Sequence, residues 1–162
     1  MLDQTFLQTA FGCFEVVGSE SGIQSVKLTD EANCSQAEVH ISLRDCVRQL
    51  EAYFRGERQS FDLKLDWGAA PEFNKSVWRE LLEIPYGHTT SYSAIAERIG
   101  NPAATRAVGL ASRNNPVAII VPCHRVIAKN GDLHGYFYGL DMKRKLVELE
   151  NPMSFARQGS LF

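Results

Sequence analysis

The feature that most constrains this chain is a short apolar segment, residues 117–121, that lies between two prolines. Pro116 precedes the segment, Pro122 follows it, and Cys123 comes next. A run of apolar residues between turn-forming residues predicts a short buried strand that ends abruptly. We therefore expect Cys123 to lie at the edge of a hydrophobic core, where the chain leaves that strand.

Cys123 has neighbours that are typical of a reactive thiol. His124 and Arg125 follow it, and positive charge beside a cysteine lowers the thiol pKa and enriches the nucleophilic thiolate. A half-buried structural cysteine is the alternative, because unpaired cysteines are among the most buried residue types. These neighbours alone leave both interpretations open.

The N-terminal part predicts an antiparallel sheet with one helix. Apolar and polar residues alternate within residues 5–28 on both sides of a Gly- and Ser-rich turn at residues 18–22. Apolar residues at helical spacing over residues 36–55 predict a helix that covers one face of the sheet. Residues 61–67 alternate strictly and predict a further strand. Residues 68–71, Gly-Ala-Ala-Pro, predict a domain boundary.

The C-terminal part predicts a helical domain that begins with three short helices, over residues 73–82, 92–99 and 102–113. Thr90 or Ser91 is suited to cap the second of these helices, and Asn101 followed by Pro102 is suited to open the third. Two short helices joined by a turn that contains Gly100 match the requirements of a helix-turn-helix.

Charge and cysteine usage favour a cytoplasmic protein with a weakly basic second half. Residues 1–71 hold six Lys and Arg against eleven Asp and Glu, a net charge of -5, whereas residues 72–162 hold eleven against eight, a net +3. If a polyanion is bound, we expect it on the second half. The asymmetry is mild, and ordinary solvated surface is the alternative that explains it equally well. The four cysteines show no Cys-x-x-Cys pair, and no apolar signal segment or membrane-length stretch is present. This pattern predicts free thiols in a reducing compartment.

A zinc site is the alternative use of the N-terminal cysteines. Cys13, Cys34 and Cys46 together with His40 provide four possible ligands. Tetrahedral zinc sites usually take their ligands in closely spaced pairs, and these four residues are not paired in that way. We therefore predict no metal site.

The segment Pro122-Cys123-His124-Arg125-Val126 resembles the acceptor-cysteine motif of the O6-alkylguanine-DNA alkyltransferases. These DNA repair proteins move an alkyl group from damaged guanine onto their own cysteine. The similarity extends over residues 78–150 and more loosely over the N-terminal part. It implies an α+β chain, with an N-terminal sheet-and-helix domain at residues 1–68 and a winged-helix-like, DNA-binding, alkyl-accepting domain at residues 72–162.

The resemblance also implies the reaction and its partner. A methyl group on O6 of guanine in double-stranded DNA would move irreversibly to Cys123, so each molecule would react once and would need no cofactor. The chain would act as a cytoplasmic monomer on the DNA minor groove. Within this scheme a Cys123–water–His124–Glu150 relay activates the thiol, and Tyr92 donates a proton to the departing guanine.

The position of Glu150 supports its part in this relay. Glu150 follows Leu146 and Val147 by four and three residues, so on a helix it would share their apolar face rather than the face of Lys143 and Arg144. A buried carboxylate needs a partner, because an unpaired buried charge costs several kcal/mol. His124 is the partner that we expect. An ordinary glutamate at a helix end is the alternative.

The resemblance assigns DNA contacts to further residues. Arg106, on a helix rich in Ala and Gly, corresponds to the arginine that fills the gap left by the extruded base, although small residues on such a helix also suit packing against the protein itself. Asn115 matches the Asn-Pro turn before the active-site strand, and Tyr136 matches the tyrosine that stacks on the bound guanine. The remaining predicted contacts are Val126, Arg113, Ala107 and Gly109.

The chain departs from the family pattern after Tyr136. Phe137 and Tyr138 stand where the family generally has small residues. Two additional rings would narrow the mouth of the pocket, so bulky adducts such as O6-benzylguanine would react poorly. If the rings swing aside, they would instead assist hydrophobic binding.

Two other functions are compatible with parts of the sequence. A lesion-binding protein that does not react would share the DNA-reading half, but relatives of that kind lack the acceptor cysteine, and Cys123 is present. A thiol hydrolase would pair Cys123 with His88 or His134 and would turn over many times.

Overall fold

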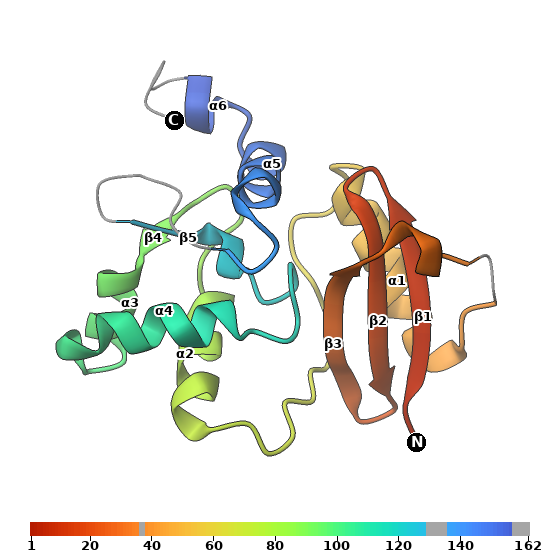
Figure 1. Cartoon of the computed structure of the whole chain (residues 1–162), viewed down its shortest axis with the longest axis horizontal. Coiled ribbons are helices and arrows are strands. Elements are labelled where there is room, and N and C mark those ends of the chain that lie inside the picture. Colours follow the sequence, from red (N-terminus) through yellow and green to blue (C-terminus); the bar gives the residue numbers. More distant parts are fainter. Residues whose placement is uncertain (36–37, 129–135, 157–162) are drawn as a thin grey trace. The chain divides into compact units, whose positions relative to one another are not determined.

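The computed structural model describes residues 1–35, 38–128 and 136–156, and it combines an antiparallel sheet with a mostly helical second part (Figure 1). This confirms the predicted fold class. The chain forms two compact units. The first unit contains Met1–Ala69 together with Pro116–Ile120, and the second contains Ala70–Asn115 together with the chain from Val121 onward. The first unit thus includes five residues from within the range predicted for the second domain.

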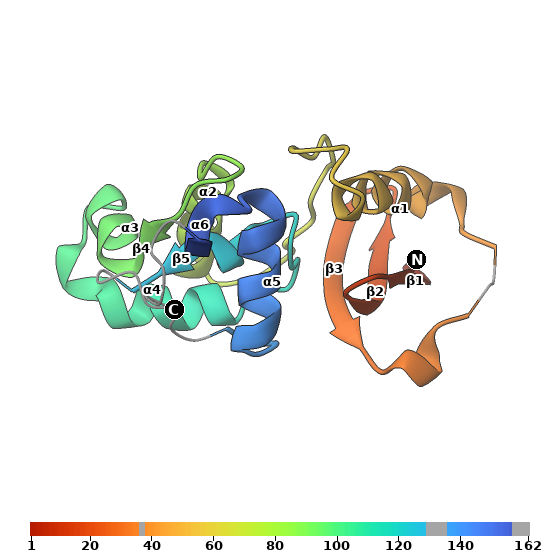
Figure 2. The ribbon, with the colours of Figure 1, turned by 90° about the horizontal axis from the view of Figure 1, so that it is seen from above.

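The first unit is built on the predicted antiparallel sheet. Strands β1 (Asp3–Thr9), β2 (Gly12–Ser19) and β3 (Gly22–Thr29) pair in the order β1-β2-β3, each with its sequence neighbour. Helix α1 (Ile41–Phe54) covers one face of this sheet (Figures 1 and 2). The alternating apolar side chains of the strands and the apolar face of α1 form the core of the unit, which includes Leu7, Phe14, Val16, Val26, Leu43, Leu50 and Tyr53.

Helix α1 begins later than the predicted start at residue 36. Ile41 is its first residue, and the described residues before it, 38–40, are not helical. The His40 side chain caps the helix, because its ring nitrogen Nδ1 accepts a hydrogen bond from the Ser42 backbone N–H at 3.1 Å. His40 also lies 3.1 Å from the Asp3 carboxylate. It is therefore a capping residue at the surface of the first unit.

Residues 61–67 do not form the predicted strand. Leu65 makes a single parallel bridge with Ile23, and Ile23 exchanges two backbone hydrogen bonds with Lys64 and Asp66, at 2.8 and 2.9 Å. The two backbones approach closely at this point, since a Cβ atom on Gly22 would lie 2.9 Å from the carbonyl carbon of Leu65. The alternation of the sequence therefore reflects an extended segment that touches the sheet at one point.

Cys13 and Cys34 form a disulfide, which contradicts the prediction that all four cysteines are free thiols. Cys13 lies in β2, and Cys34 follows the 3₁₀ helix η1 (Glu31–Asn33). The two residues are far apart in the sequence, so their spacing did not indicate a disulfide. Cys46 is a buried free cysteine, and burial raises the pKa of its thiol to about 12.

The apolar run at residues 117–121 is buried as predicted, but it is not a strand. Val117 makes one parallel bridge with Val26. The chain then reverses at Ile119, which has a φ of 73°, and the Ile120 N–H donates to the Ala118 carbonyl at 2.8 Å. This is a three-residue γ-turn, a rare and strained conformation for a β-branched residue. Composition alone predicted the burial but could not predict the turn.

The second unit contains the predicted helices. Its helical elements and two short strands are α2 (Glu72–Leu82), β4 (Thr90–Ser91), α3 (Tyr92–Arg98), η2 (Pro102–Ala104), α4 (Thr105–Arg113), η3 (Cys123–Arg125), β5 (Val126–Ile127), α5 (Leu140–Glu150) and α6 (Met153–Ala156). Strands β4 and β5 pair in parallel. Helix α2 is tied to α4 by the buried Trp78, whose indole N–H donates to the Ala111 carbonyl at 2.9 Å.

The ends of the helix-turn-helix follow the predicted signals in part. The Ser91 hydroxyl caps α3 by accepting a hydrogen bond from the Ala94 N–H at 3.1 Å, as expected. Asn101 does not cap the next helix with its side chain. Pro102 opens a 3₁₀ turn instead, and α4 begins only at Thr105.

We expect the disulfide to stabilise the first unit. Because it closes a loop with a sequence separation of 21, its loss in Cys34→Ser should lower the free energy of unfolding by roughly 3 kcal/mol. Urea unfolding of wild type and variant, with and without dithiothreitol, measures this. Reductant should destabilise the wild type alone, and a wild type that is insensitive to reductant would contradict the assignment.

Candidate active site

Two consecutive tight turns place Cys123 at the surface of the second unit's core. Pro122 has φ and ψ of -83° and 65°, and the Cys123 N–H donates to the Val121 carbonyl at 2.8 Å, which is an inverse γ-turn. The 3₁₀ helix η3 starts at Cys123 itself. Proline fixes the φ that this turn requires, so the sequence before the cysteine sets the direction of its side chain. Cys123 is 8% exposed.

Asn115 holds the thiol from the other side. Its amide Nδ2 donates to the Val121 carbonyl at 2.8 Å and lies 3.3 Å from the Cys123 sulfur. Asn115 is itself buried. The sequence predicted a turn residue at this position, and the structure adds a direct contact with the reactive atom. A donor at this distance stabilises the thiolate relative to the thiol.

The thiol at rest is protonated, contrary to the prediction from its neighbours. Burial raises the pKa of the Cys123 thiol above its ordinary value, and the Asn115 hydrogen bond and the charge of Lys143 only partly offset this. Arg125 does not lower this pKa, because its guanidinium is bound elsewhere. The thiol therefore needs a base to reach its reactive form.

Glu150, His124 and Arg125 form a buried cluster. The Glu150 carboxylate lies 2.7 Å from Nε2 of His124 and accepts hydrogen bonds from Nε and Nη2 of Arg125 at 2.7 and 3.0 Å. Arg125 also donates from Nη1 to the Ile84 carbonyl at 2.6 Å. The side chains of His124 and Glu150 are 0% and 2% exposed. The expected contact between residues 124 and 150 is thus present, and Arg125 is a further partner that sequence analysis did not identify.

The cluster sets the protonation states of its members. Burial alone would raise the pKa of Glu150, but hydrogen bonds and positive charge from His124 and Arg125 lower it to about 2. Burial lowers the pKa of His124, and Glu150 offsets only part of this effect. At neutral pH the pair is therefore a neutral imidazole beside a carboxylate, which is the form that can accept a proton.

Lys143 is a buried residue of the site that sequence analysis placed on the wrong face of its helix. It is 0% exposed and lies on the buried side of α5, three residues before Leu146 and seven before Glu150. Its Nζ lies 3.4 Å from the Tyr92 hydroxyl and 5.7 Å from the centre of the Tyr92 ring. Burial lowers the pKa of Lys143 to about 8, although the Cys123 thiolate opposes this. The spacing of 3, 4 and 7 residues could have revealed this position.

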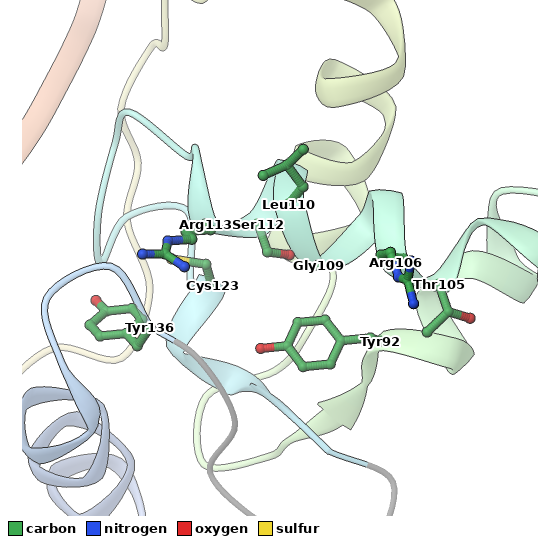
Figure 3. Close-up of a pocket in the computed structure, with 9 residues that line it drawn as sticks. All are labelled: Tyr92, Thr105, Arg106, Gly109, Leu110, Ser112, Arg113, Cys123 and Tyr136. Atoms are coloured by element: carbon green, nitrogen blue, oxygen red, sulfur yellow. The ribbon is translucent and has the colours of Figure 1, made fainter.

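A pocket of about 650 Å³ opens in front of Cys123 (Figure 3). Its described lining comes from the start of α3, one side of α4, the first residue of η3 and the chain before α5. The residues are Tyr92, Thr105, Arg106, Gly109, Leu110, Ser112, Arg113, Cys123 and Tyr136. Burial raises the pKa of Tyr92 to about 12, and Cys123 makes a second, smaller contribution in the same direction. The Tyr92 hydroxyl therefore keeps its proton.

Most of the residues predicted to bind or react meet at this pocket. Six of them are in its lining, namely Tyr92, Arg106, Gly109, Arg113, Cys123 and Tyr136. The other five lie outside that lining. Four of them are buried, namely His124, Asn115, Glu150 and Val126, and the fifth, Ala107, is exposed. Thr105, Leu110 and Ser112 line the pocket but were not predicted.

Phe137 and Tyr138 do not narrow the pocket as expected, because neither is among its described lining residues. Phe137 is 62% exposed, and its ring packs edge-on against Tyr138 with 5.0 Å between centroids. Tyr138 in turn packs edge-on against Tyr136 at 5.7 Å. The two additional rings therefore support Tyr136 from outside, and they supply no argument against bulky adducts.

The geometry does not support the hydrolase alternative. His88 lines a separate pocket of about 250 Å³, with Nδ1 3.1 Å from the Tyr86 carbonyl oxygen, and His134 lies outside the described residues.

Among the described residues, no three His, Cys, Asp or Glu side chains are grouped as metal ligands would be. In the same part of the chain, no helix has the length and apolar character needed to cross a bilayer.

Comparison with known proteins identifies the family. Residues 72–152 match the 6-O-methylguanine DNA methyltransferase DNA binding domain, and residues 3–67 match the ribonuclease-like domain of the same proteins. The chain belongs to the 6-O-methylguanine DNA methyltransferase family. This confirms the resemblance that was inferred from the residues around Cys123.

Family members resemble the chain over nearly its whole length. The methylated-DNA--protein-cysteine methyltransferase of Methanosarcina acetivorans is 51% identical over 88% of this chain and 94% of its own length. The protein of that name from Mycolicibacterium paratuberculosis is 42% identical over 93% of each chain. A crystal structure of Mycobacterium tuberculosis OGT in complex with DNA has a TM-score of 0.82, with 41% identity over 92% of each chain.

We expect Glu150→Gln to destabilise the protein by about 3 to 5 kcal/mol at pH 7, because Arg125 and His124 lose a buried charged partner. The folded-state pKa of Glu150 is depressed, so its stabilising effect is present above about pH 4.5 and is lost as the pH falls towards about 2. The difference between wild type and variant, measured by urea unfolding, should therefore shrink between pH 7 and pH 3.

Glu148→Gln on the same helix is the matched control. Glu148 pairs with Arg144 at 2.8 Å, but both side chains are nearly half exposed. Its replacement should change the free energy of unfolding by less than about 1 kcal/mol at either pH. An equal loss in both variants would contradict the importance of the buried cluster.

Proposed function

We propose that this protein repairs DNA by transferring a methyl group from O6 of guanine to the sulfur of Cys123. The observation that carries the proposal is a cysteine at the wall of a pocket of about 650 Å³, with an Asn115 donor on its sulfur. The next residue, His124, is a neutral imidazole bound to the buried Glu150 carboxylate. Membership of the methyltransferase family supports the same reaction.

Thiolate formation is the first step of the proposed mechanism. His124 is neutral because burial lowers the pKa of its ring, and its Nδ1 has no hydrogen-bond partner among the described residues. We assign Nδ1 as the atom that receives the thiol proton, through a bridging water. Glu150 stabilises the imidazolium that results. The Asn115 amide and the Lys143 charge then stabilise the thiolate.

Transfer is the second step. The sulfur attacks the methyl carbon, the bond from that carbon to O6 breaks, and the departing guanine takes a proton from the Tyr92 hydroxyl. Tyr92 carries that proton at neutral pH because its pKa is about 12. The Lys143 ammonium beside the Tyr92 oxygen stabilises the phenolate that forms. A thioether has no route back to a thiolate here, so each molecule reacts once and requires no cofactor.

The DNA partner of the chain binds the helix-turn-helix side of the pocket in this proposal. A target atom inside a duplex is inaccessible, so the guanine must leave the stack. We assign α4 to the minor groove, where the small residues Ala107 and Gly109 permit close approach and Arg106 fills the gap left by the extruded base. Arg113 contacts the DNA backbone and Tyr136 stacks on the flipped guanine, whereas Val126 is buried outside the described lining and keeps no assigned contact. The protein acts as a cytoplasmic monomer.

Mass spectrometry after incubation with a duplex that contains O6-methylguanine tests the reaction. We expect one added methyl on the peptide that contains Cys123, in at most stoichiometric yield. Cys46 is an internal control, because burial raises the pKa of its thiol to about 12 and it should remain unmodified. An unmodified protein that binds the duplex tightly would instead support the non-reacting lesion-binding alternative, and repeated turnover would support a hydrolase.

Arg106→Ala tests the role of α4. If Arg106 replaces the extruded base, its loss should slow methyl transfer from duplex DNA by at least about tenfold more than transfer from a single strand, where no stack must be opened. Single-turnover rates on the two substrates give this ratio. Arg98→Ala is the matched control, because Arg98 is exposed on α3 and bound to Glu80 at 3.1 Å. An equal loss of rate on both substrates would show that Arg106 takes no part in extruding the base.

A further inference from the structure

Ser112 is a buried polar residue whose hydroxyl the proposed mechanism does not use. It is 4% exposed, in the last turn of α4. Its Oγ has no hydrogen-bond partner among the described residues. Serine in a helix commonly donates to the carbonyl four residues earlier, here Val108, but Ser112 does not. Buried hydroxyl groups in folded proteins nearly always have a partner, so this one is suited to receive a partner that arrives from outside.

The partner must arrive through the pocket of Cys123, because Ser112 lines it. Figure 3 shows the Ser112 hydroxyl directed into the pocket beside Gly109. Thr105 carries the other aliphatic hydroxyl of the described lining, and it already donates to the Pro102 carbonyl at 3.4 Å. Ser112 is therefore the serine or threonine of this lining that is left to bond a ligand.

The position of Ser112 indicates which part of the substrate it meets. In the view of Figure 3, Tyr136 and Ser112 lie on different sides of Cys123. If the guanine ring stacks on Tyr136 and the sulfur attacks the transferred carbon in line with its bond to O6, the rest of a longer O6 substituent points sideways from that line, and we place its end on the side of Ser112. Next to Ser112, Gly109 and Leu110 offer no polar side-chain group, and the other labelled lining residues on that side of Cys123 are Tyr92, Thr105 and Arg106.

We propose that Ser112 is a specificity-determining residue that favours O6 adducts with a hydroxyl at their far end, such as O6-(2-hydroxyethyl)guanine. This inference rests on the proposed function. The bond from sulfur to the first substituent carbon forms as the bond from that carbon to O6 breaks. The thiol proton goes to His124, guanine gains a proton from Tyr92, and proton exchange with solvent returns both residues to neutrality. The product is S-(2-hydroxyethyl)cysteine, and Ser112 takes no covalent part.

Two substrates of equal size test the proposal. Duplexes that carry O6-(2-hydroxyethyl)guanine or O6-propylguanine differ by a hydroxyl in place of a methyl. Single-turnover rates of wild type and Ser112→Ala are measured on both duplexes, and for each protein the rate on the hydroxyethyl adduct is divided by the rate on the propyl adduct. The intrinsic difference in reactivity between the two adducts is the same for both proteins, so it cancels when the two ratios are compared. We expect Ser112→Ala to lower the ratio three- to tenfold, the effect of one hydrogen bond. Thr105→Ala, which removes a hydroxyl that already has a partner, should leave the ratio unchanged.

Other outcomes overturn the inference without affecting the proposed function. If wild type transfers methyl to Cys123 but Ser112→Ala keeps the wild-type ratio, Ser112 does not select the adduct. If the variant slows both substrates equally, its hydroxyl serves the guanine ring. A loss of several degrees in the melting temperature of Ser112→Ala would show that the hydroxyl is already bonded within the protein. Absence of any methyl on wild-type Cys123 would instead overturn the proposed function itself.

Discussion

The second unit depends on one buried carboxylate. Glu150 binds Arg125 through both carboxylate oxygens and His124 through one, and both partners come from the short helix that starts at Cys123. The carboxylate therefore fixes the backbone next to the reactive sulfur to the C-terminal end of α5. Buried charges of this kind contribute little net stability but cost several kcal/mol when one partner is lost. Their value here is positional, because in the proposed mechanism they hold His124, the base, next to Cys123, the nucleophile.

Burial shifts the pKa of four groups of the site in the direction that the proposed reaction needs. It raises the pKa of the Cys123 thiol and of the Tyr92 phenol, and it lowers the pKa of His124 and Lys143. Before DNA binds, the thiol is protonated and inactive, the imidazole is free to accept a proton, and the phenol is able to donate one. In the proposed reaction, desolvation thus keeps the Cys123 thiol protonated until a substrate binds.

The sequence predicted which side chains lie together better than it predicted the backbone that supports them. The spacing of Glu150 from Leu146 and Val147 indicated a buried carboxylate, and the same spacing would have indicated Lys143 had its charge not suggested a solvent-exposed face. The alternation at residues 61–67 and the apolar run at 117–121 reflect burial, which extended segments and turns share with strands. The Cys13–Cys34 bond depends on tertiary proximity, which no local pattern encodes. The same holds for the Ser112 hydroxyl, which has no partner within the described part of the chain.

The membership of Pro116–Ile120 in the first unit has a consequence for how this protein can be divided. The chain leaves the second unit after Asn115 and re-enters it at Val121, two residues before the acceptor cysteine. A fragment that starts at the linker near Ala70 would retain every pocket residue of the described lining. It would lack strand β3, to which Val117 is bridged, so Val117, Ala118 and Ile119, which are buried in the intact chain, would become exposed. Separating the second part of the chain at that linker would thus yield a fragment with an exposed apolar loop directly before Cys123.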